Sequence, residues 1–127
     1  MSDKIKYSIE FPVKASPKML YQYLTTPSGL SEWFANDVNF RGEKYTFFWD
    51  NSEEEARILS KRNNVFIKMK WEDDDDDESY FEFRIQIDDL TNDASLIVTD
   101  FAEEDEVEEN KLLWETQIHS LLHAIGS

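Results

Sequence analysis

The sequence predicts an α+β fold in which a seven-stranded, curved antiparallel sheet wraps around one long C-terminal helix. Apolar and polar residues alternate in one run near the start of the chain and then in a series of runs between positions 36 and 102. After about position 106 the apolar residues instead follow helical spacing. A series of hairpins makes an antiparallel sheet, and the apolar stripe of the helix must be buried against it.

Seven strands follow from the alternation. In the first, apolar side chains occupy every second position from Ile5 to Val13, and Pro12 marks the end of the strand. The alternation is equally clear from Phe81 to Ile87. Turn residues such as those at 41–43 and 91–93 separate the later strands. These later strands are expected over residues 37–41, 44–50, 54–61, 64–72, 79–88 and 94–101.

Two short helices are predicted between the first two strands. Ser16 can cap the first helix, with Pro17 at its first helical position, and this helix should run to about Leu24. Thr26-Pro27 then interrupts it, because the residue before a proline disfavours the helical conformation. Residues 28–34 are expected to form a second helix of one or two turns. The pair would close one end of the curved sheet.

The long terminal helix is expected from about Glu106 to Ile125, where Gly126 stops it. His119 and His123 lie opposite its apolar stripe, so we expect both histidines on the surface. The stripe itself consists of Val107, Trp114, Ile118, Leu121, Leu122 and Ile125.

The composition limits the class of protein. With 127 residues, of which 40% are hydrophobic and 14% aromatic, the chain should form one domain over 1–127 with a single sizeable core. Its net charge of -15 argues against nucleic acid and against anionic membrane surfaces as partners. A basic protein partner would instead suit such an acidic surface. The sequence leaves the oligomeric state open.

Two further features concern the compartment. The chain contains no cysteine, which excludes disulfide bonds, thiolate catalysis and cysteine-based zinc sites. Its N-terminal residues lack the apolar run of a signal peptide, and no segment approaches the length of a transmembrane helix. We therefore expect a cytoplasmic protein that does not insert into membranes.

The segment from Thr26 to Leu30, followed by Trp33-Phe34, resembles a turn common in the START-like superfamily. This superfamily has the helix-grip fold and is also known through plant pollen-allergen-like lipid carriers. Trp114 on the terminal helix adds to the resemblance, which extends over essentially the whole chain. Within the superfamily, the chain is most similar to small bacterial domains that resemble the activator of the Hsp90 ATPase. It is shorter than lipid-transfer START domains, which implies a smaller cavity.

The resemblance implies three different functions. Members of the superfamily bind lipids, serve as protein-interaction modules or cyclise polyketides, and the fold alone does not choose among them. The first expectation is a non-catalytic domain that binds a small, largely apolar ligand between helix and sheet. The second is an interaction module related to Hsp90 activators. The third and weakest is a cyclase-like enzyme.

Aromatic residues are the candidates for the cavity wall. At strand and helix spacing they are more often plain core than ligand wall. Asn110 and Gln117 favour a cavity, because they flank Trp114 on the inward side of the helix, where buried amides need partners. The candidate ligand-binding residues are therefore Trp33, Phe34, Trp49, Trp71, Asn110, Trp114 and Gln117.

Catalytic and metal-binding motifs are scarce. The chain has neither a G-x-S-x-G elbow nor a glycine-rich phosphate loop, and an enzyme would need a buried histidine or a pair such as Asp100 with Arg57. His119 and His123 have the spacing of a metal-binding pair, but the glutamate of an H-E-x-x-H motif is absent. We expect no catalytic residue, no metal and no cofactor.

Two acidic runs have structural explanations. The run Asp73–Asp77 does not fit a calcium loop, because Glu78 stands where glycine is required, so we expect a solvated hairpin tip. Crowding should raise the pKa of its carboxyl groups. The run Glu103–Glu109 lies at a helix N-terminus, where Asp105 and Glu108 have the spacing of a capping box.

Overall fold

The computed structural model describes residues 4–126; the expected domain also includes residues 1–3 and 127, which lie outside the described part. It confirms the predicted order of strand, two helices, six strands and helix. The elements are β1 (Lys4–Val13), α1 (Pro17–Thr25), α2 (Pro27–Leu30), β2 (Asp37–Arg41), β3 (Lys44–Trp49), β4 (Ser52–Arg62), β5 (Phe66–Trp71), β6 (Phe81–Ile87), β7 (Ala94–Glu103), the 3-10 turn η1 (Glu104–Glu106) and α3 (Val107–Ile125).

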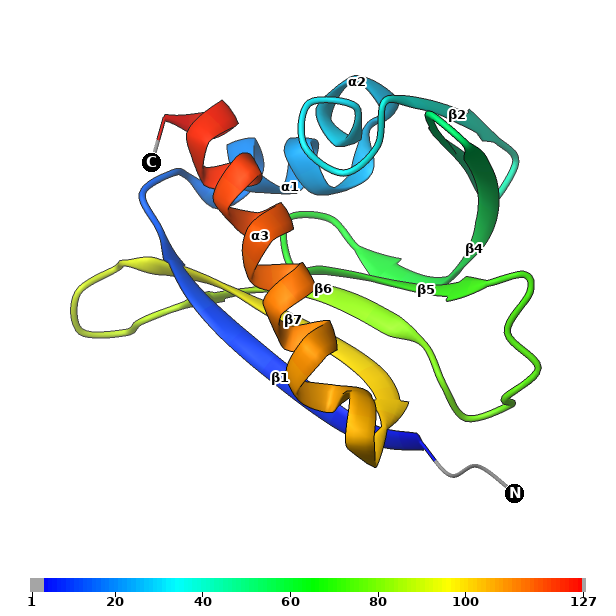
Figure 1. The fold of residues 1–127 in the computed structure, drawn as a ribbon. Helices are drawn as coiled ribbons and strands as arrows, with labels where there is room; N and C mark the ends of the chain where they lie inside the picture. Colours follow the sequence, from blue (N-terminus) through cyan, green and yellow to red (C-terminus); the bar gives the residue numbers. More distant parts are fainter. Residues whose placement is uncertain (1–3, 127) are drawn as a thin grey trace.

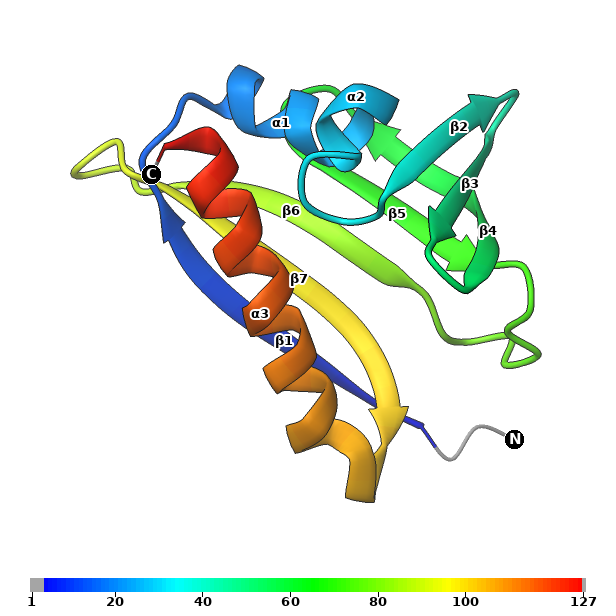
Figure 2. The same cartoon turned by 45° about the horizontal axis from the view of Figure 1, so that its top comes forward.

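The strands form one antiparallel, seven-stranded sheet, as predicted, and their order in the sheet is β1-β7-β6-β5-β4-β3-β2. The sheet is strongly curved, and α3 lies diagonally across its concave side (Figures 1 and 2). The helices α1 and α2 cover one end of this side (Figure 2). Between β4 and β5 the register shifts at Ile58 and Ser60, a bulge that locally increases strand twist. None of the helices in the described range 4–126 is long and apolar enough to cross a membrane.

The turn between α1 and α2 depends on side-chain caps and on one glycine. The Ser16 hydroxyl accepts a hydrogen bond from the Met19 backbone N at 3.1 Å, which confirms the predicted cap. Gly29 packs directly against α1: a Cβ atom there would lie 2.4 Å from the Gln22 carbonyl oxygen. Only glycine allows this approach. The second helix is shorter than predicted and ends at Leu30, followed by turns to residue 34.

The core fills much of the concave side. Inward-facing residues occur at every second position of the strands, and Phe47, Phe81 and Phe83 are completely buried. From α3, the core receives Trp114, Ile118 and Leu121, as the apolar stripe predicts.

The start of α3 differs from the expectation. The capping box of Asp105 and Glu108 was a wrong prediction, because the chain first makes the turn η1 and the helix then begins at Val107. Glu106 occupies the N-cap position, and no side chain caps the helix there. The end of α3 is as predicted: Gly126 adopts a left-handed conformation, with φ 87°, and its N–H donates to the carbonyls of Leu122 and His123.

Candidate functional site

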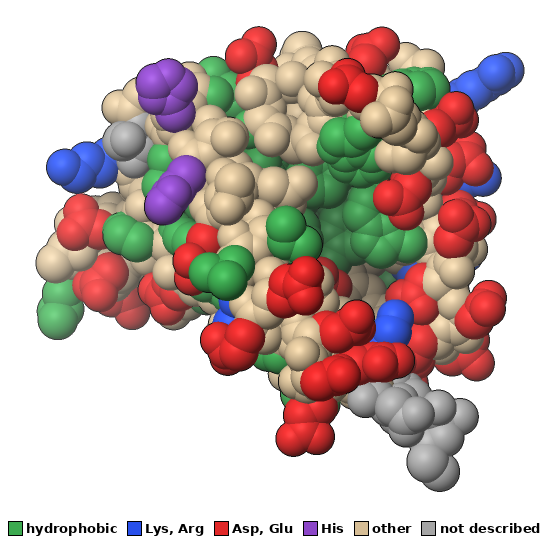
Figure 3. Space-filling model, in the orientation of Figure 1, with side chains coloured by type: hydrophobic (Ala, Val, Ile, Leu, Met, Phe, Trp, Pro, Cys, Tyr) green, Lys and Arg blue, Asp and Glu red, His purple; other side chains and the backbone are tan. Residues whose placement is uncertain are grey.

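A hollow of about 470 Å³ lies between the N-terminal half of α3 and the concave side of the sheet. In the space-filling view it is a green depression edged by red acidic side chains (Figure 3). Residues from the α2–β2 connection, from the four strands β3, β4, β5 and β7, and from α3 line it: Phe34, Trp49, Glu54, Trp71, Asp100, Asn110, Leu113, Trp114, Thr116 and Gln117.

The aromatic wall of the hollow is organised around Phe34. Its ring stacks against those of Trp71 and Trp114, with centroids 6.3 and 6.1 Å away and interplanar angles of 15° and 17°. Trp49 meets the same ring edge-on at 5.8 Å, and its indole N–H donates to the Phe34 carbonyl at 3.0 Å. Such ring pairs add to the free energy of area burial and hold the rings in fixed orientations. The wall is therefore preformed.

Asp100 is the buried acid of the site. It extends the inward-facing series of β7, after Leu96 and Val98. The Trp114 indole N–H donates to Asp100 Oδ2 at 2.9 Å, and the Phe101 backbone N donates to Oδ1 at 2.8 Å. Burial raises the pKa of Asp100, and these two hydrogen bonds, together with the charge of Lys4, only partly oppose it.

Tyr7 lies beside Asp100 as its cross-strand neighbour in β1. Its hydroxyl is buried and makes no hydrogen bond of acceptable geometry to any residue that the structure describes. Burial, with the nearby charge of Asp100, raises the pKa of this hydroxyl, so Tyr7 stays neutral over the physiological range. A buried hydroxyl without a hydrogen-bond partner destabilises a fold, so the Tyr7 hydroxyl lowers stability although its ring is part of the core.

A second acid, Glu54, reaches the hollow from β4. Glu54 lies two and four positions before Ala56 and Ile58, so its side chain is on the same inward face of the strand as theirs. Unlike Ala56, it remains exposed. Two carboxylates from different strands thus face the aromatic wall, and among the described residues that line the hollow none is Lys, Arg or His.

The structure brings six of the seven predicted cavity residues together. Trp33 is the exception: its ring packs on Phe34 and Phe83 in the core, and its indole N–H donates to the Tyr23 carbonyl at 2.8 Å. The six that line the hollow are Phe34, Trp49, Trp71, Asn110, Trp114 and Gln117.

Sequence reasoning missed Glu54, Leu113 and Thr116. Glu54 could have been found from its position two residues before Ala56, which places both side chains on the inward face of β4. The suggested pair of Asp100 and Arg57 does not form. Instead, the Arg57 Nη1 atom lies 3.7 Å from the Glu72 Oε1 atom. Arg57 is three residues after Glu54 on β4, so its side chain lies on the opposite face of the strand and points away from the concave side.

Neither the histidines nor the acidic cluster at the start of α3 belongs to the hollow. His119 and His123 are exposed, as predicted. Glu103, Asp105 and Glu106 bring carboxylate oxygens within 4.8 Å of one another, but all three are exposed and their clustering fits ordinary helix N-terminal charge.

The loop between β5 and β6 corrects two expectations about the acidic run. Its centre is not a fully solvated tip, because the Asp74 side chain is only 15% exposed and lies 3.4 Å from the Lys4 ammonium. Partial burial would raise the pKa of Asp74, but the Ser79 hydroxyl, the Asp76 backbone N–H and the charges of Lys4 and Lys70 together lower it. The pKa of Asp74 is therefore lowered, whereas crowding was expected to raise it.

This loop borders the site. A smaller depression of about 430 Å³ is lined by Lys4, Trp71 and the run Asp73–Asp76. Trp71 lines both this depression and the main hollow, so the acidic loop begins directly beyond one aromatic wall of the site.

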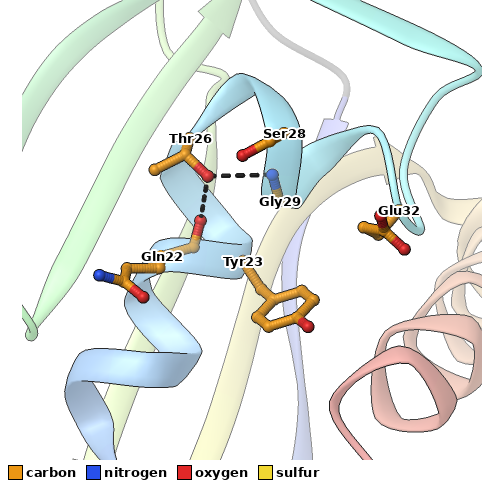
Figure 4. Close-up of a pocket in the computed structure, with 6 residues that line it drawn as sticks. All are labelled: Gln22, Tyr23, Thr26, Ser28, Gly29 and Glu32. Atoms are coloured by element: carbon orange, nitrogen blue, oxygen red, sulfur yellow. Dashed lines mark hydrogen bonds between the residues drawn. The ribbon is translucent and has the colours of Figure 1, made fainter.

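Another hollow, of about 440 Å³, lies at the α1–α2 turn (Figure 4). Thr26 lies in it and is already used by the turn: its hydroxyl accepts from the Gly29 N–H at 2.9 Å and donates to the Gln22 carbonyl at 2.7 Å. Of its described lining residues, Tyr23 alone is aromatic, and its hydroxyl donates to the Ala124 carbonyl at 3.4 Å. These groups serve the packing of α1, α2 and α3, so the hollow beside Trp114 is the better candidate site.

Comparisons with known proteins agree with this geometry. A family model of the START-like superfamily domain matches residues 1–127. Among solved structures, BfR322 from Bacteroides fragilis is similar at 33% identity and a TM-score of 0.70, with 96% of this chain and 91% of that chain covered. No curated protein sequence matches the chain.

Two more distant structures show the same fold. The Aha1 dimer from Colwellia psychrerythraea is similar at 20% identity and a TM-score of 0.77, covering 94% of this chain and 95% of that chain. CalU16 from Micromonospora echinospora is similar at 16% identity and a TM-score of 0.73, covering 94% and 73%. The family match over the whole chain, together with the curved sheet that holds α3, shows that this protein belongs to the START-like superfamily.

Proposed function

We propose that the protein is a non-catalytic START-like domain that binds a small, largely apolar ligand in the hollow between α3 and the sheet. The observation that carries the proposal is the preformed aromatic wall of this hollow, in which the Phe34 ring stacks against both Trp71 and Trp114. The volume of about 470 Å³ falls in the range of roughly 300–1,000 Å³ that is usual for small-molecule sites.

The polar groups of the hollow suit binding better than catalysis. Asn110 and Gln117 offer amide donors and acceptors on either side of Trp114, which is the sparse set of polar groups expected of an orienting site. Asp100 is held by Trp114 and by its own backbone and has no basic partner at hydrogen-bonding distance among the described residues. A cyclase-like reaction would need a buried histidine or a carboxylate–arginine pair to move a proton, and no histidine, lysine or arginine is among the described residues that line the hollow.

The proposal is tested by blocking the hollow. Thr116 and Ser120 are exposed residues one turn apart on α3, and each donates to the carbonyl four residues earlier, at 3.1 and 3.5 Å. Only Thr116 lines the hollow. We expect Thr116→Trp to weaken binding of Nile red, a neutral apolar fluorophore, by about tenfold or more because the new ring occupies the site. Ser120→Trp adds the same ring outside the hollow and should leave binding unchanged.

Native mass spectrometry of the purified protein provides a second readout. A small molecule that co-purifies with the wild type and with Ser120→Trp, but not with Thr116→Trp, would support the proposal. Equal Nile red binding by both variants, or none by the wild type, would refute it.

A second candidate function is a protein-interaction module. Two observations favour it: the net charge of -15, and the exposed side chains of Leu112 and Leu113 on α3, which are 62% and 60% accessible. The fold is also that of Aha1 from Colwellia psychrerythraea. An acidic surface would recruit a basic partner, and its capture in a pull-down should collapse with added salt. Binding of apolar ligands would in contrast change little with salt.

A further inference from the structure

The ionisable residues that line the hollow all carry negative charge when they are ionised. Its two ionisable lining residues are both acids, Glu54 on β4 and Asp100 on β7, and they stand on different strands of the concave side. Beyond Trp71 the acidic loop adds Asp73–Asp76. The nearby cation of that depression, Lys4, lies 3.4 Å from Asp74.

The aromatic wall has the same electrostatic preference as the acids. Indole and phenyl faces carry partial negative charge, so they attract ammonium groups and do not favour anions. Trp49, Trp71 and Trp114 supply three indoles around one hollow. Tryptophan is the best aromatic partner for a cation.

The charge of the whole chain acts in the same direction. With a net charge of -15, the long-range field of the protein attracts cations and repels anions before contact. A fatty-acid-like carboxylate would approach against this field and would then meet Glu54 and Asp100 without a compensating lysine or arginine in the described lining.

We propose that the ligand of this hollow is an organic cation, a protonated or quaternary amine joined to an aryl or alkyl body. This inference rests on the proposed function and adds a charge class to it. The apolar body lies along Phe34 and the indoles, and the amine lies toward Glu54 and Asp100.

The experiment uses four probes measured by isothermal titration calorimetry. Phenylbutyl(trimethyl)ammonium is the cation, its tert-butyl isostere is neutral with the same shape, and phenylpentanoate is the anion. Choline provides a cation without the apolar body. We expect the aryl cation to bind roughly tenfold more tightly than the neutral isostere, and the anion and choline to bind more weakly than the isostere. The preference for the cation should shrink with added salt.

Matched variants separate the carboxylates of the hollow from overall charge. Glu54→Gln should lower affinity for the aryl cation by about threefold to tenfold and leave the neutral isostere unaffected. Glu53→Gln removes the same charge from the neighbouring position of β4, which is exposed and lies on the opposite face of the strand. It should change the affinity for neither the aryl cation nor the neutral isostere. Asp100→Asn should also lower affinity for the cation, and an amide oxygen can still accept from the Trp114 indole.

The outcomes distinguish this inference from the proposed function. Equal affinities for the cation and its isostere, tighter binding of the anion, or equal effects of Glu53→Gln and Glu54→Gln would overturn the cation inference while leaving an apolar site. Equal binding of choline and the aryl cation would overturn the requirement for an apolar body. Failure of every probe, together with failure of Nile red, would overturn the proposed function itself.

Discussion

The two halves of α3 lie on the same sheet but do different things. In the C-terminal half, Ile118 and Leu121 are completely buried, and the Tyr23 hydroxyl of α1 donates to the Ala124 carbonyl at 3.4 Å. In the N-terminal half, Trp114 is buried, but Leu113 is 60% exposed along an open hollow. One half of α3 is core, and the other half forms a wall of the hollow proposed as the ligand site.

The residue types explain the difference. Aliphatic side chains in the closed half interdigitate with the sheet and leave little space. The open half presents the amides Asn110 and Gln117 where a packed helix would carry apolar residues. A helix that grips the sheet at one end can therefore leave a hollow at the other end at little expense to stability.

The largest expected effect comes from Trp114, where the two halves meet. Its ring is 7% exposed and packs against Phe34, Phe81 and Phe83, and its N–H serves Asp100. Trp114→Ala should lower the free energy of unfolding by about 3–5 kcal/mol. The measurement is guanidinium unfolding followed by circular dichroism.

A milder variant isolates the hydrogen bond of Trp114. Trp114→Phe keeps a ring but removes the N–H that donates to Asp100, so we expect a smaller loss of roughly 1–3 kcal/mol. A loss below about 1 kcal/mol for the alanine variant would mean that the open half contributes nothing to stability.

The next effect compares one leucine from each half. Leu121→Ala removes completely buried atoms and should cost about 2–5 kcal/mol, whereas Leu113→Ala removes an exposed side chain and should stay within roughly 0.5 kcal/mol. The same unfolding assay measures both. Nile red binding should respond in the opposite order, because Leu113 lines the hollow and Leu121 does not. Equal losses of stability would remove the distinction between the halves.

Most of the fold could be predicted because each element has its own local signal. The alternation placed all seven strands to within two residues at each end, and Ser16 and Gly126 marked helix ends correctly. The failures involve choices between competing local structures. Spacing alone could not show that residues 104–106 form a 3-10 turn before α3. Nor could it place the bulge at Ile58, which depends on the register with β5.

The site was predictable on the helix side and less so on the strand side. Asn110 and Gln117 stood out because amides interrupt an apolar face. Asp100 was considered only as a partner of Arg57, because its hydrogen bond from Trp114 at 2.9 Å depends on how α3 packs against β7. Trp33 and Trp49 look alike in sequence, and only the packing shows that Trp33 is core while Trp49 lines the hollow.

The smallest effect is a pH dependence in which the hollow and the acidic loop act in opposite directions. Burial gives Asp100 a raised pKa in the folded state, so the folded protein takes up that proton before the unfolded chain does. Stability should therefore rise as pH falls from neutral through the raised pKa toward the ordinary value of 3.8. Asp74 has a lowered pKa, so its contribution is present above 3.8 and is lost as pH falls below that value.

Maximum stability should consequently lie on the acid side of neutrality but above 3.8, with Asp100 responsible for the rise and Asp74 for part of the later fall. Guanidinium midpoints measured across this range test the prediction. Asp100→Asn should abolish the rise, because it removes the carboxyl group that titrates in the hollow. Ser79→Ala should weaken the fall, because it removes a hydrogen bond that favours ionised Asp74. If the rise persisted in Asp100→Asn, it would originate in charge repulsion elsewhere on this acidic surface, and the hollow would have no part in the acid response.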